Sequence, residues 1–390
     1  MPAILFTTIL ALSALYVPQP LLPVLTAEFG VARETAALLT TIAFIPLSLS
    51  PLFYGVLLEM VSAKRMLRFA VLLLALSEAL MFVVEPFAGL MALRLLQGLL
   101  IPAMLTSLMT YVSQITGKGD VAKAMAWYIA ATILGGFAGR VFSGLIASLL
   151  HWRFSFLFLG FGLLVAWLWL GRIPDAGSVK VTRLSMGGLR KVIADPVVRT
   201  ACCMVFCFFL AFAAMMNYLP FRLTELSASA DEFRIGLAYS GYLMGIVVSL
   251  NAVHLHRRCG GAERAMIGGL VFFVAALLVM SVPHVAALVG GMFLLCGSSF
   301  LTHATATGYL NRYMSEHKGV VNGLYIAFYY GGGAVGSYLP GYAYRGFGWE
   351  GFIATLIAVL LIALLLAVRL ARMARSAPVD LHAVDHLRRG

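Results

Sequence analysis

The stretch 128–144 reads YIAATILGGFAGRVFSG, and 197 positions later residues 325–341 read YIAFYYGGGAVGSYLPG. The two stretches share a Tyr-Ile-Ala start, a Gly-Gly pair and two further glycines in the same register. The same offset places Leu22-Pro23 on Leu219-Pro220 and Trp152 on Trp349. Because one offset serves matches so far apart, the sequence indicates an internal duplication. We therefore expect two halves with the same topology.

The composition excludes an ordinary soluble domain. Apolar residues make up 62% of the 390 residues, charged residues make up 11%, and the mean hydropathy is +0.95. Soluble domains are about 45–50% apolar and about 25% charged. A membrane-spanning helix needs roughly 20 mainly apolar residues. Runs of that kind predict an all-α integral membrane fold with twelve transmembrane helices, arranged as two pseudo-symmetric six-helix bundles. The expected helices are 3–27, 35–58, 66–85, 86–114, 121–148, 153–172, 197–221, 234–257, 264–283, 284–310, 319–344 and 350–373.

The repeat and the breaks between apolar runs divide the chain into four parts. We expect an N-terminal six-helix bundle over 1–172, a basic cytoplasmic linker over 173–196, a C-terminal bundle over 197–373 and a cytoplasmic tail over 374–390. Six helices return the chain to the side where it started, so the halves are parallel repeats. Transporters built this way place the substrate between the halves near the bilayer midplane. The first helix lacks a basic leader, so we expect it in the mature protein.

The basic residues are distributed unevenly over the predicted loops. The net charge is +12, and 21 of the 28 Lys and Arg residues fall in even-numbered loops and the tail, against five in odd-numbered loops. Lys and Arg accumulate in cytoplasmic loops. We therefore expect a bacterial inner-membrane protein with both termini in the cytoplasm, in contact with the lipid bilayer and not with nucleic acid.

The segment after the second predicted helix carries the first family resemblance. Residues 55–65 read GVLLEMVSAKR and resemble the signature G-x-L-x-D-x-x-G-R-R/K of the major facilitator superfamily. The resemblance implies the twelve-helix fold of that family and a charged cytoplasmic gate. The gate residues would be Gly55, Glu59, Lys64 and Arg65. Glu59 replaces the usual Asp, and an ordinary basic loop with an interfacial Glu is the alternative.

Two ionisable residues lie inside predicted helices at matching depth. Residues 93–98 read LRLLQG and resemble the superfamily motif R-x-x-Q-G, whose Arg is associated with proton coupling. Glu78 and Arg94 each lie eight residues from Pro86, at a depth of about 12 Å. A charge inside a membrane helix is costly and needs a partner. We expect Glu78 and Arg94 to be partners, as a proton-sensitive pair or as a buried structural ion pair.

The glycine-rich stretch of the fifth helix resembles a motif of exporters. Residues 135–144 read GGFAGRVFSG and are similar to the antiporter motif G-x-x-x-G-P-x-x-G-G of drug:proton antiporters, in particular the branch of YnfM-type exporters. Arg140 occupies the position of the motif's Pro and is a candidate anion-binding or gating group. The resemblance implies glycines at the contact between helices 5 and 8, with tight packing alone as the alternative. The helix-interface glycines are Gly135, Gly136, Gly139, Gly144, Gly332 and Gly336.

In the family that the motifs resemble, helices 1, 4, 7 and 10 line the central cavity. The polar and aromatic residues that these helices offer here are Tyr16, Gln19, Gln97, Tyr111, Asn217, Tyr218, Ser299 and Thr302. Packing between helices is the alternative for each of them. His303 lies well within a helix and is a candidate proton relay, or a hydrogen-bonded structural residue.

Together these features predict a secondary active transporter that moves a small organic molecule by alternating access. Proton-coupled efflux is the expected mode, driven by the proton gradient without a cofactor. A facilitator or proton symporter for a metabolite is the alternative, and a non-transporting membrane sensor is a remote one. The sequence shows no metal-ligand spacing and no polar catalytic cluster, so neither a metal site nor an enzyme is expected, and we expect a monomer.

Overall fold

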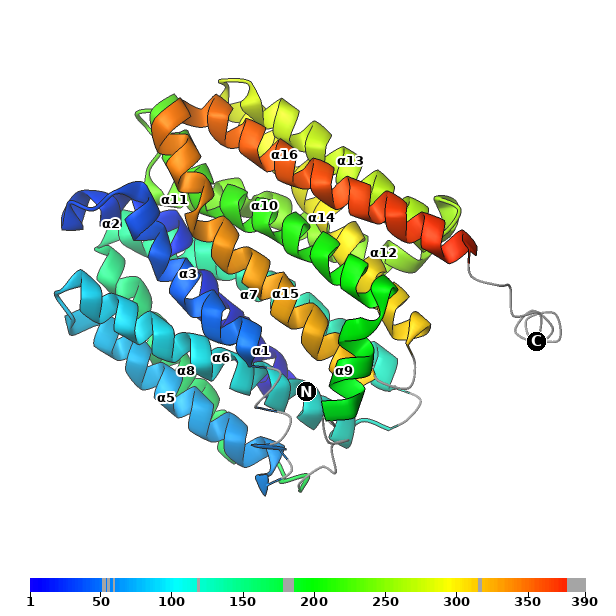
Figure 1. Cartoon of the computed structure of the whole chain (residues 1–390). Coiled ribbons are helices and arrows are strands. Elements are labelled where there is room, and N and C mark those ends of the chain that lie inside the picture. Colours follow the sequence, from blue (N-terminus) through cyan, green and yellow to red (C-terminus); the bar gives the residue numbers. More distant parts are fainter. Residues whose placement is uncertain are drawn as a thin grey trace.

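The computed structural model describes residues 1–50, 54, 57–58, 60–117, 120–177, 186–314 and 318–376, and over these residues the chain is helical between short connections (Figure 1). The first half comprises α1 (Pro2–Tyr16), η1 (Gln19–Leu21), α2 (Leu22–Phe29), α3 (Arg33–Leu49), α5 (Ala63–Val83), α6 (Phe87–Ile115), α7 (Val121–Leu149) and α8 (Trp152–Gly171). Helix α9 (Met186–Ala194) connects the halves. The second half comprises α10 (Pro196–Leu226), α11 (Glu232–Ala238), η2 (Tyr239–Gly241), α12 (Tyr242–Arg258), α13 (Ala262–Ser281), α14 (Val285–Tyr313), α15 (Lys318–Tyr338) and α16 (Pro340–Ser376).

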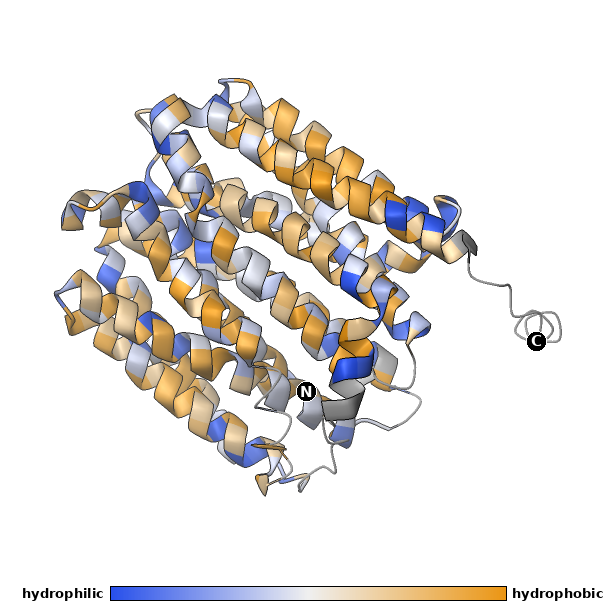
Figure 2. Ribbon diagram, viewed as in Figure 1, coloured by the Kyte–Doolittle hydropathy of each residue, from blue (hydrophilic) through white to orange (hydrophobic). Residues whose placement is uncertain are grey.

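Ten segments of the described chain are long and apolar enough to cross a bilayer. Figure 2 shows the apolar residues along the middle of these helices and the polar ones toward their ends. The other two predicted helices correspond to α3 and α15. Helix α3 is described over 17 residues and precedes the undescribed positions 51–53. Helix α15 mixes apolar residues with glycines, tyrosines and Asn322.

The 197-residue repeat appears in the structure as equivalent backbone contacts. A Cβ added at Gly135 would lie 2.5 Å from the carbonyl oxygen of Ile9, and one at Gly332 would lie 2.2 Å from that of Phe206. Ile9 and Phe206 are themselves 197 positions apart. The same offset relates the contact of Gly139 with Ser13 to that of Gly336 with Leu210. In each half, the fifth helix therefore packs closely on the first helix at equivalent glycines.

The eleventh helix departs from the prediction of one helix over 319–344. Helix α15 ends at Tyr338, and α16 starts at Pro340 and contains non-helical backbone at Gly348. Proline has no N–H to continue the hydrogen-bond ladder, so the helix is interrupted there. Gly348 has φ 65° and ψ −165°, a conformation that glycine adopts without a steric penalty. This residue separates 340–347 from the last membrane helix.

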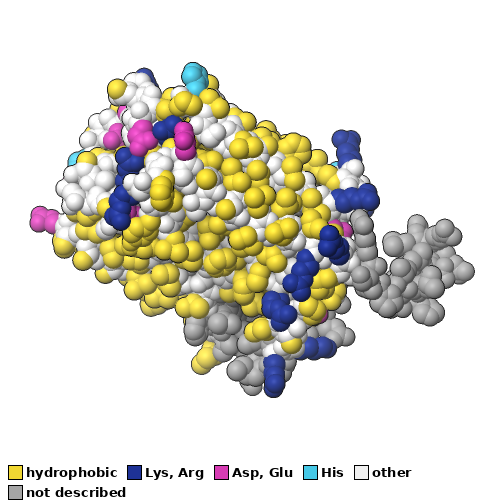
Figure 3. Space-filling view, turned by 45° about the horizontal axis from the view of Figure 1, so that its top comes forward, with side chains coloured by type: hydrophobic (Ala, Val, Ile, Leu, Met, Phe, Trp, Pro, Cys, Tyr) yellow, Lys and Arg dark blue, Asp and Glu magenta, His cyan; other side chains and the backbone are white. Residues whose placement is uncertain are grey.

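The two halves meet mainly along two contact regions. Helix α3 packs on α15, and α7 packs on α11 and α12 (Figure 1). We call the end of the bundle with the connections at 30–32, 227–231 and Gly348 the distal end. The proximal end holds the start of α1 and the end of α16. Figure 3 shows Lys and Arg side chains gathered on the right, where α16 ends, beyond a broad apolar band.

Candidate substrate and proton sites

Arg140 on α7 is buried completely without a carboxylate to balance its charge. Its side chain is 0% exposed, and no ion pair joins it to an acid in the described part of the chain. The guanidinium carbon lies 4.2 Å from the ring centre of Tyr16, 4.9 Å from that of Tyr239 and 4.6 Å from that of Tyr242. Aromatic faces attract cations. Three tyrosine rings from both halves thus take the place of a counter-ion, and we call this group the tyrosine cage.

A chain of hydrogen bonds runs from Arg140 to the other half. Its Nε donates to Gln19 Oε1 at 2.7 Å, and Gln19 Nε2 donates to Asn217 Oδ1 at 2.7 Å. Arg140 Nη1 donates to the carbonyl of Gly136 at 2.6 Å. Two buried donors, Arg140 Nη2 and Asn217 Nδ2, have no hydrogen-bond partner. A buried donor without an acceptor costs about 1–3 kcal/mol, so this site is chemically incomplete as it stands.

Glu78 on α5 is also fully buried, and neither of its carboxyl oxygens has a hydrogen-bond partner. The expected direct pair with Arg94 is therefore absent, although the two charges are close enough to interact. Arg94 instead donates to the carbonyls of Ala14, Leu15 and Leu39 at 2.7–2.9 Å and to Gln97 Oε1 at 2.6 Å. It lies at the contact of α1, α3 and α6, where backbone oxygens outcompete the carboxylate for its nitrogens.

The glycines of the fifth helix have two separate roles. Gly135 and Gly139 face α1 in their own half, as Gly332 and Gly336 face α10. This corrects the expectation that the glycines as a group line the contact between helices 5 and 8. Gly144 does lie there, because an added Cβ would meet the carbonyl oxygen of Glu232 at 2.2 Å. Gly136 faces the rings of Tyr242 and Tyr16 in the tyrosine cage.

Ion pairs at the distal end join the halves, and they were not predicted from the sequence. Arg33 Nη1 lies 2.6 Å from Glu225 Oε1, and Tyr344 donates to the same carboxylate at 2.8 Å. Arg345 pairs with Glu34. We call these two ion pairs the distal latch. The predicted odd-numbered loops contain few charges, so the presence of both acidic and basic residues there could have indicated the distal latch.

The predicted gate falls partly on undescribed positions. Gly55 and Glu59 lie outside the described residues. Lys64 donates to the carbonyls of Gly171 and Ile173, and Arg65 lies 3.8 Å from Asp175. These cations therefore contact the chain that follows α8, within their own half.

His303 shares a hydrogen bond of 2.8 Å with the hydroxyl of Tyr325 through Nδ1, and its ring lies 4.8 Å from that of Tyr329. It is half-buried on α14. The hydrogen bond is consistent with both interpretations of this residue, a relay and a structural histidine.

The remaining predicted cavity residues are spread over the bundle. Tyr111 donates to the carbonyl of Pro174 near the proximal end, and Tyr218 donates to that of Tyr338 near the distal end. Thr302 lies against Gly269 on α13, inside the second half. Ser299 is buried and its hydroxyl has no partner. Of the eight, Tyr16, Gln19 and Asn217 come together at Arg140, whereas Gln97 binds Arg94.

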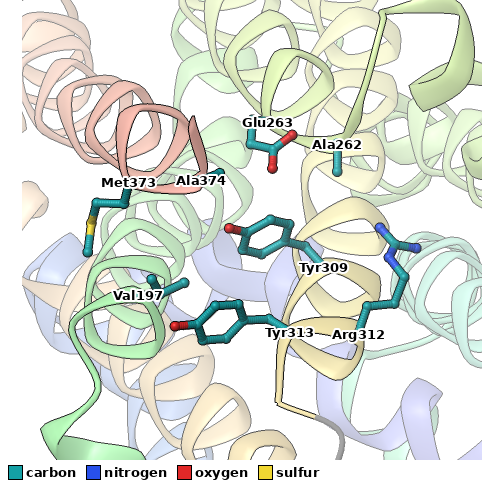
Figure 4. A pocket seen from close by; sticks show the side chains of 8 residues that line it. All are labelled: Val197, Ala262, Glu263, Tyr309, Arg312, Tyr313, Met373 and Ala374. Atoms are coloured by element: carbon teal, nitrogen blue, oxygen red, sulfur yellow. The ribbon is translucent and has the colours of Figure 1, made fainter. Parts of the chain in front are cut away.

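A cavity of about 710 Å³ lies elsewhere, at the proximal end of the second half (Figure 4). It is lined by Val197, Ala262, Glu263, Tyr309, Arg312, Tyr313, Met373 and Ala374. All of these residues belong to α10, α13, α14 and α16, so the cavity is internal to one half. Among the described residues, no group of three or more His, Cys, Asp or Glu side chains could hold a metal ion.

The duplicated six-helix pattern agrees with a comparison against known families. The model described as Major Facilitator Superfamily matches residues 4–336, and again 202–386. The chain belongs to the Major Facilitator Superfamily. The predicted fold class is thereby confirmed, as is the resemblance at the level of the superfamily. The match does not distinguish the drug:proton antiporter branch.

Relatives within the superfamily match nearly the whole chain. The inner membrane transport protein YnfM of Escherichia coli K12 is 28% identical over 374 residues, covering 94% of this chain and 89% of that protein. The uncharacterized MFS-type transporter YybF of Bacillus subtilis 168 is 25% identical over 366 residues, covering 92% and 90%. The chain is thus a multi-pass membrane protein of a bacterial transporter family.

Solved structures show the same fold at low sequence identity. A bacterial homologue of the human lysosomal transporter Spinster, inward-facing and unoccupied, superposes with a TM-score of 0.74 at 13% identity, covering 96% of both chains. The peptide transporter POT in complex with sulfate superposes with a TM-score of 0.79 at 12% identity, covering 96% of this chain and 94% of that one. The fold and the relatives are those of transporters.

Proposed function

We propose that this protein exports a small organic molecule in exchange for protons by alternating access. The superfamily membership supports secondary transport. The observation that carries proton coupling is Glu78, a fully buried carboxyl whose oxygens have no hydrogen-bond partner. An ionised carboxylate in such a place is costly, and intramembrane carboxyls of this kind mark proton relays.

The surroundings of Glu78 suggest how a proton could act on the transport cycle. Its charge interacts with Arg94, and Arg94 binds carbonyls of α1 and α3. Helix α3 packs on α15 of the other half. Gain or loss of the Glu78 charge therefore changes the electrostatic environment of Arg94. Arg94 holds α1 and α3 together, and α3 contacts the opposite half. This is a route from protonation to the relative position of the halves.

Several further parts of the proposal follow from the charge distribution. With both termini in the cytoplasm of a bacterium, the proximal end faces inward and the distal latch closes the periplasmic side. The protein then works as a monomer in the inner membrane. It draws energy from the proton gradient without a cofactor, and its partners are the lipid bilayer and the small-molecule substrate.

The test is transport in proteoliposomes that hold an opposed or a parallel pH gradient. Entrapped pyranine reads the internal pH, while 2-naphthoate and ethidium serve as the first probe solutes. We expect at least one of these two probes, an anion and a cation, to move against the direction of proton flow in the wild type, and we expect loss of that coupling in Glu78→Gln. Ser77→Ala on the same helix is the matched control, because the Ser77 hydroxyl is buried and bonds only to its own helix. Coupled flux retained by Glu78→Gln would sink the proposal.

A facilitator or proton symporter for a metabolite remains the second candidate. Two observations favour it over an antiporter. Arg140 takes the place of the antiporter motif's Pro, and Gly135 and Gly139 pack inside one half and not between the halves. In the same liposomes, a symporter would move solute and protons in the same direction, and a facilitator would move solute without a pH change.

A further inference from the structure

We propose that Arg140 and Asn217 bind the carboxylate of an aromatic organic acid, whose ring system lies on the neighbouring aromatic side chains. This inference rests on the proposed function, because it names the substrate class of that transporter. It assigns the tyrosine cage as the anionic end of a substrate site between the halves.

The two buried arginines differ in how their nitrogens are bonded. Arg94 uses Nε, Nη1 and Nη2 as donors to backbone carbonyls of α1 and α3. Arg140 is equally buried, yet its Nη2 has no acceptor. An arginine that only held helices together would have its nitrogens satisfied, as Arg94 does. The free Nη2 keeps a charged donor available for a planar, two-oxygen acceptor such as a carboxylate.

The second donor comes from the opposite half. Asn217 Nδ2 is fully buried and also unpartnered, while Oδ1 of the same amide accepts from Gln19. Gln19 in turn accepts from Arg140. The two free donors thus lie at either end of one hydrogen-bonded chain that crosses between the halves. A ligand that satisfies both ends contacts both halves, as a substrate must in alternating access.

Aromatic side chains lie on the proximal side of this polar centre. Phe209 precedes Asn217 by eight residues on α10, or about 12 Å along the helix. Its ring stacks on Tyr329 with 3.6 Å between centroids. Phe44 of the first half lies 6.1 Å from Phe209 and 6.3 Å from Tyr16 of the tyrosine cage. The rings form a continuous buried cluster from the cage inward, and aromatic faces of this kind are suited to pack against a flat apolar body when the halves move apart.

The charges of the site exclude an organic cation. The faces of Tyr16, Tyr239 and Tyr242 are already occupied by the guanidinium. Two acids at the distal end, Glu34 and Glu225, are engaged by Arg345 and Arg33. A cationic ligand would meet an uncompensated positive charge in a low-dielectric interior, where repulsion is strongest.

Binding to the detergent-purified full chain tests the proposal without any gradient. The probes are 2-naphthoate, 2-naphthamide and 2-naphthylmethylamine, which share one ring system and differ in charge. We expect a concentration-dependent rise of the unfolding temperature with the carboxylate alone, since a ligand that binds the folded state stabilises it. Equal shifts with the amide or the amine, or no shift with 2-naphthoate, would overturn the proposal.

Two substitutions locate the site. Asn217→Asp keeps the size and the acceptor for Gln19 but replaces the free donor by an oxygen, so we expect affinity for 2-naphthoate to fall on the order of tenfold or more. Arg140→Lys keeps a charge but loses the planar fork, and we expect a similar loss. Ser148→Ala on α7, where the hydroxyl is exposed and bonds only to Leu145, is the matched control. Unchanged affinity in Asn217→Asp contradicts the assignment even if Arg140→Lys does not fold. Because binding is measured without protons moving, its outcome is separate from that of the coupling test.

Discussion

Gln19 and Asn217 form a buried hydrogen bond of 2.7 Å between the first helical segment of one half and the first helix of the other. Their positions differ by 198, one residue more than the repeat offset, so the bond joins nearly equivalent places in the two halves. Gln19 also accepts from Arg140. A single amide side chain therefore links the pseudo-symmetric halves and fixes the buried cation.

Replacing Gln19 by Leu should destabilise the protein measurably. The change leaves Arg140 Nε and Asn217 Oδ1 without partners in a buried place, and each such group costs about 1–3 kcal/mol. Thermal unfolding in detergent measures the loss, with Ser148→Ala as a control whose effect should stay within about 0.5 kcal/mol. A Gln19→Leu protein as stable as the wild type would mean that the amide does not hold the halves together.

The glycine contacts predict equivalent effects in the two halves. A Cβ at Gly139 would lie 2.5 Å from Ser13 Cα, and a Cβ at Gly336 would lie 2.1 Å from the Leu210 carbonyl oxygen. Because backbone atoms cannot move aside, Gly139→Ala and Gly336→Ala should each cost about 1–3 kcal/mol by overpacking. Gly268→Ala on α13 is the matched control, since no atom lies within 4 Å of its added Cβ. That substitution should be neutral or stabilising, and similar melting temperatures for all three variants would contradict the contact.

Much of the fold was predictable because a helix that crosses the membrane needs roughly 20 apolar residues, so the length of an apolar run predicts the helix. The predicted helix at 121–148 is α7 at Val121–Leu149, and the one at 197–221 lies within α10 at Pro196–Leu226. The 197-residue repeat aligned the glycines of the fifth and eleventh helices, and these glycines are where the helices pack closely. Glycine lacks a side chain, so positions of close packing could be recognised from the sequence. The break at Gly348 falls in the predicted connection between the helices 319–344 and 350–373. The interruption between Tyr338 and Pro340 was not predicted, because a proline inside an apolar run is compatible with both a kinked helix and a helix end.

The site was predictable in its residue types but not in its pairings. Depth along a helix placed Glu78 and Arg94 at one level, yet it gave no information about rotation around the helix axis. Arg94 points to carbonyls of α1 and α3, and such backbone acceptors are invisible in a sequence. The link of Arg140 to Gln19 spans 121 positions and depends on the packing of α7 against the first helical segment.

The connection after α8 should show a pH-dependent contribution from Asp175. The Gly177 N–H, together with the Ser62 hydroxyl and Arg65, holds the pKa of the Asp175 carboxyl below its ordinary value. A carboxyl whose folded-state pKa is lowered stabilises the fold at neutral pH and loses that contribution as the pH falls through the folded-state pKa. The melting temperature of Asp175→Asn should thus lie below that of the wild type at pH 7, and the gap should narrow on acidification. A gap that stays constant with pH would show that the charge of Asp175 is not involved.

The distal latch should set how often the distal end opens. Arg33–Glu225 and Arg345–Glu34 join the halves. Arg33, Glu225 and Arg345 are partly exposed to solvent, although Glu34 is buried, so we expect each pair to contribute about 0.2–1 kcal/mol. Neutralising both acids in a Glu34→Gln, Glu225→Gln variant should shift the population toward a distally open state by up to about thirtyfold, because the two contributions add to at most about 2 kcal/mol. Spin labels at Leu149 and Phe347, both exposed at the distal end of opposite halves, report the separation in a chain freed of its five cysteines.

The expected result is a new population at longer distance between the two labels. Arg234→Gln is the matched control, because its partner Asp231 belongs to the same half and the pair does not cross between the halves. The control should leave the distance distribution unchanged. If the doubly neutralised variant gives the same distribution as the wild type, the packing of α3 on α15 and of α7 on α11 holds the distal end closed without the charges, and the latch has no part in gating.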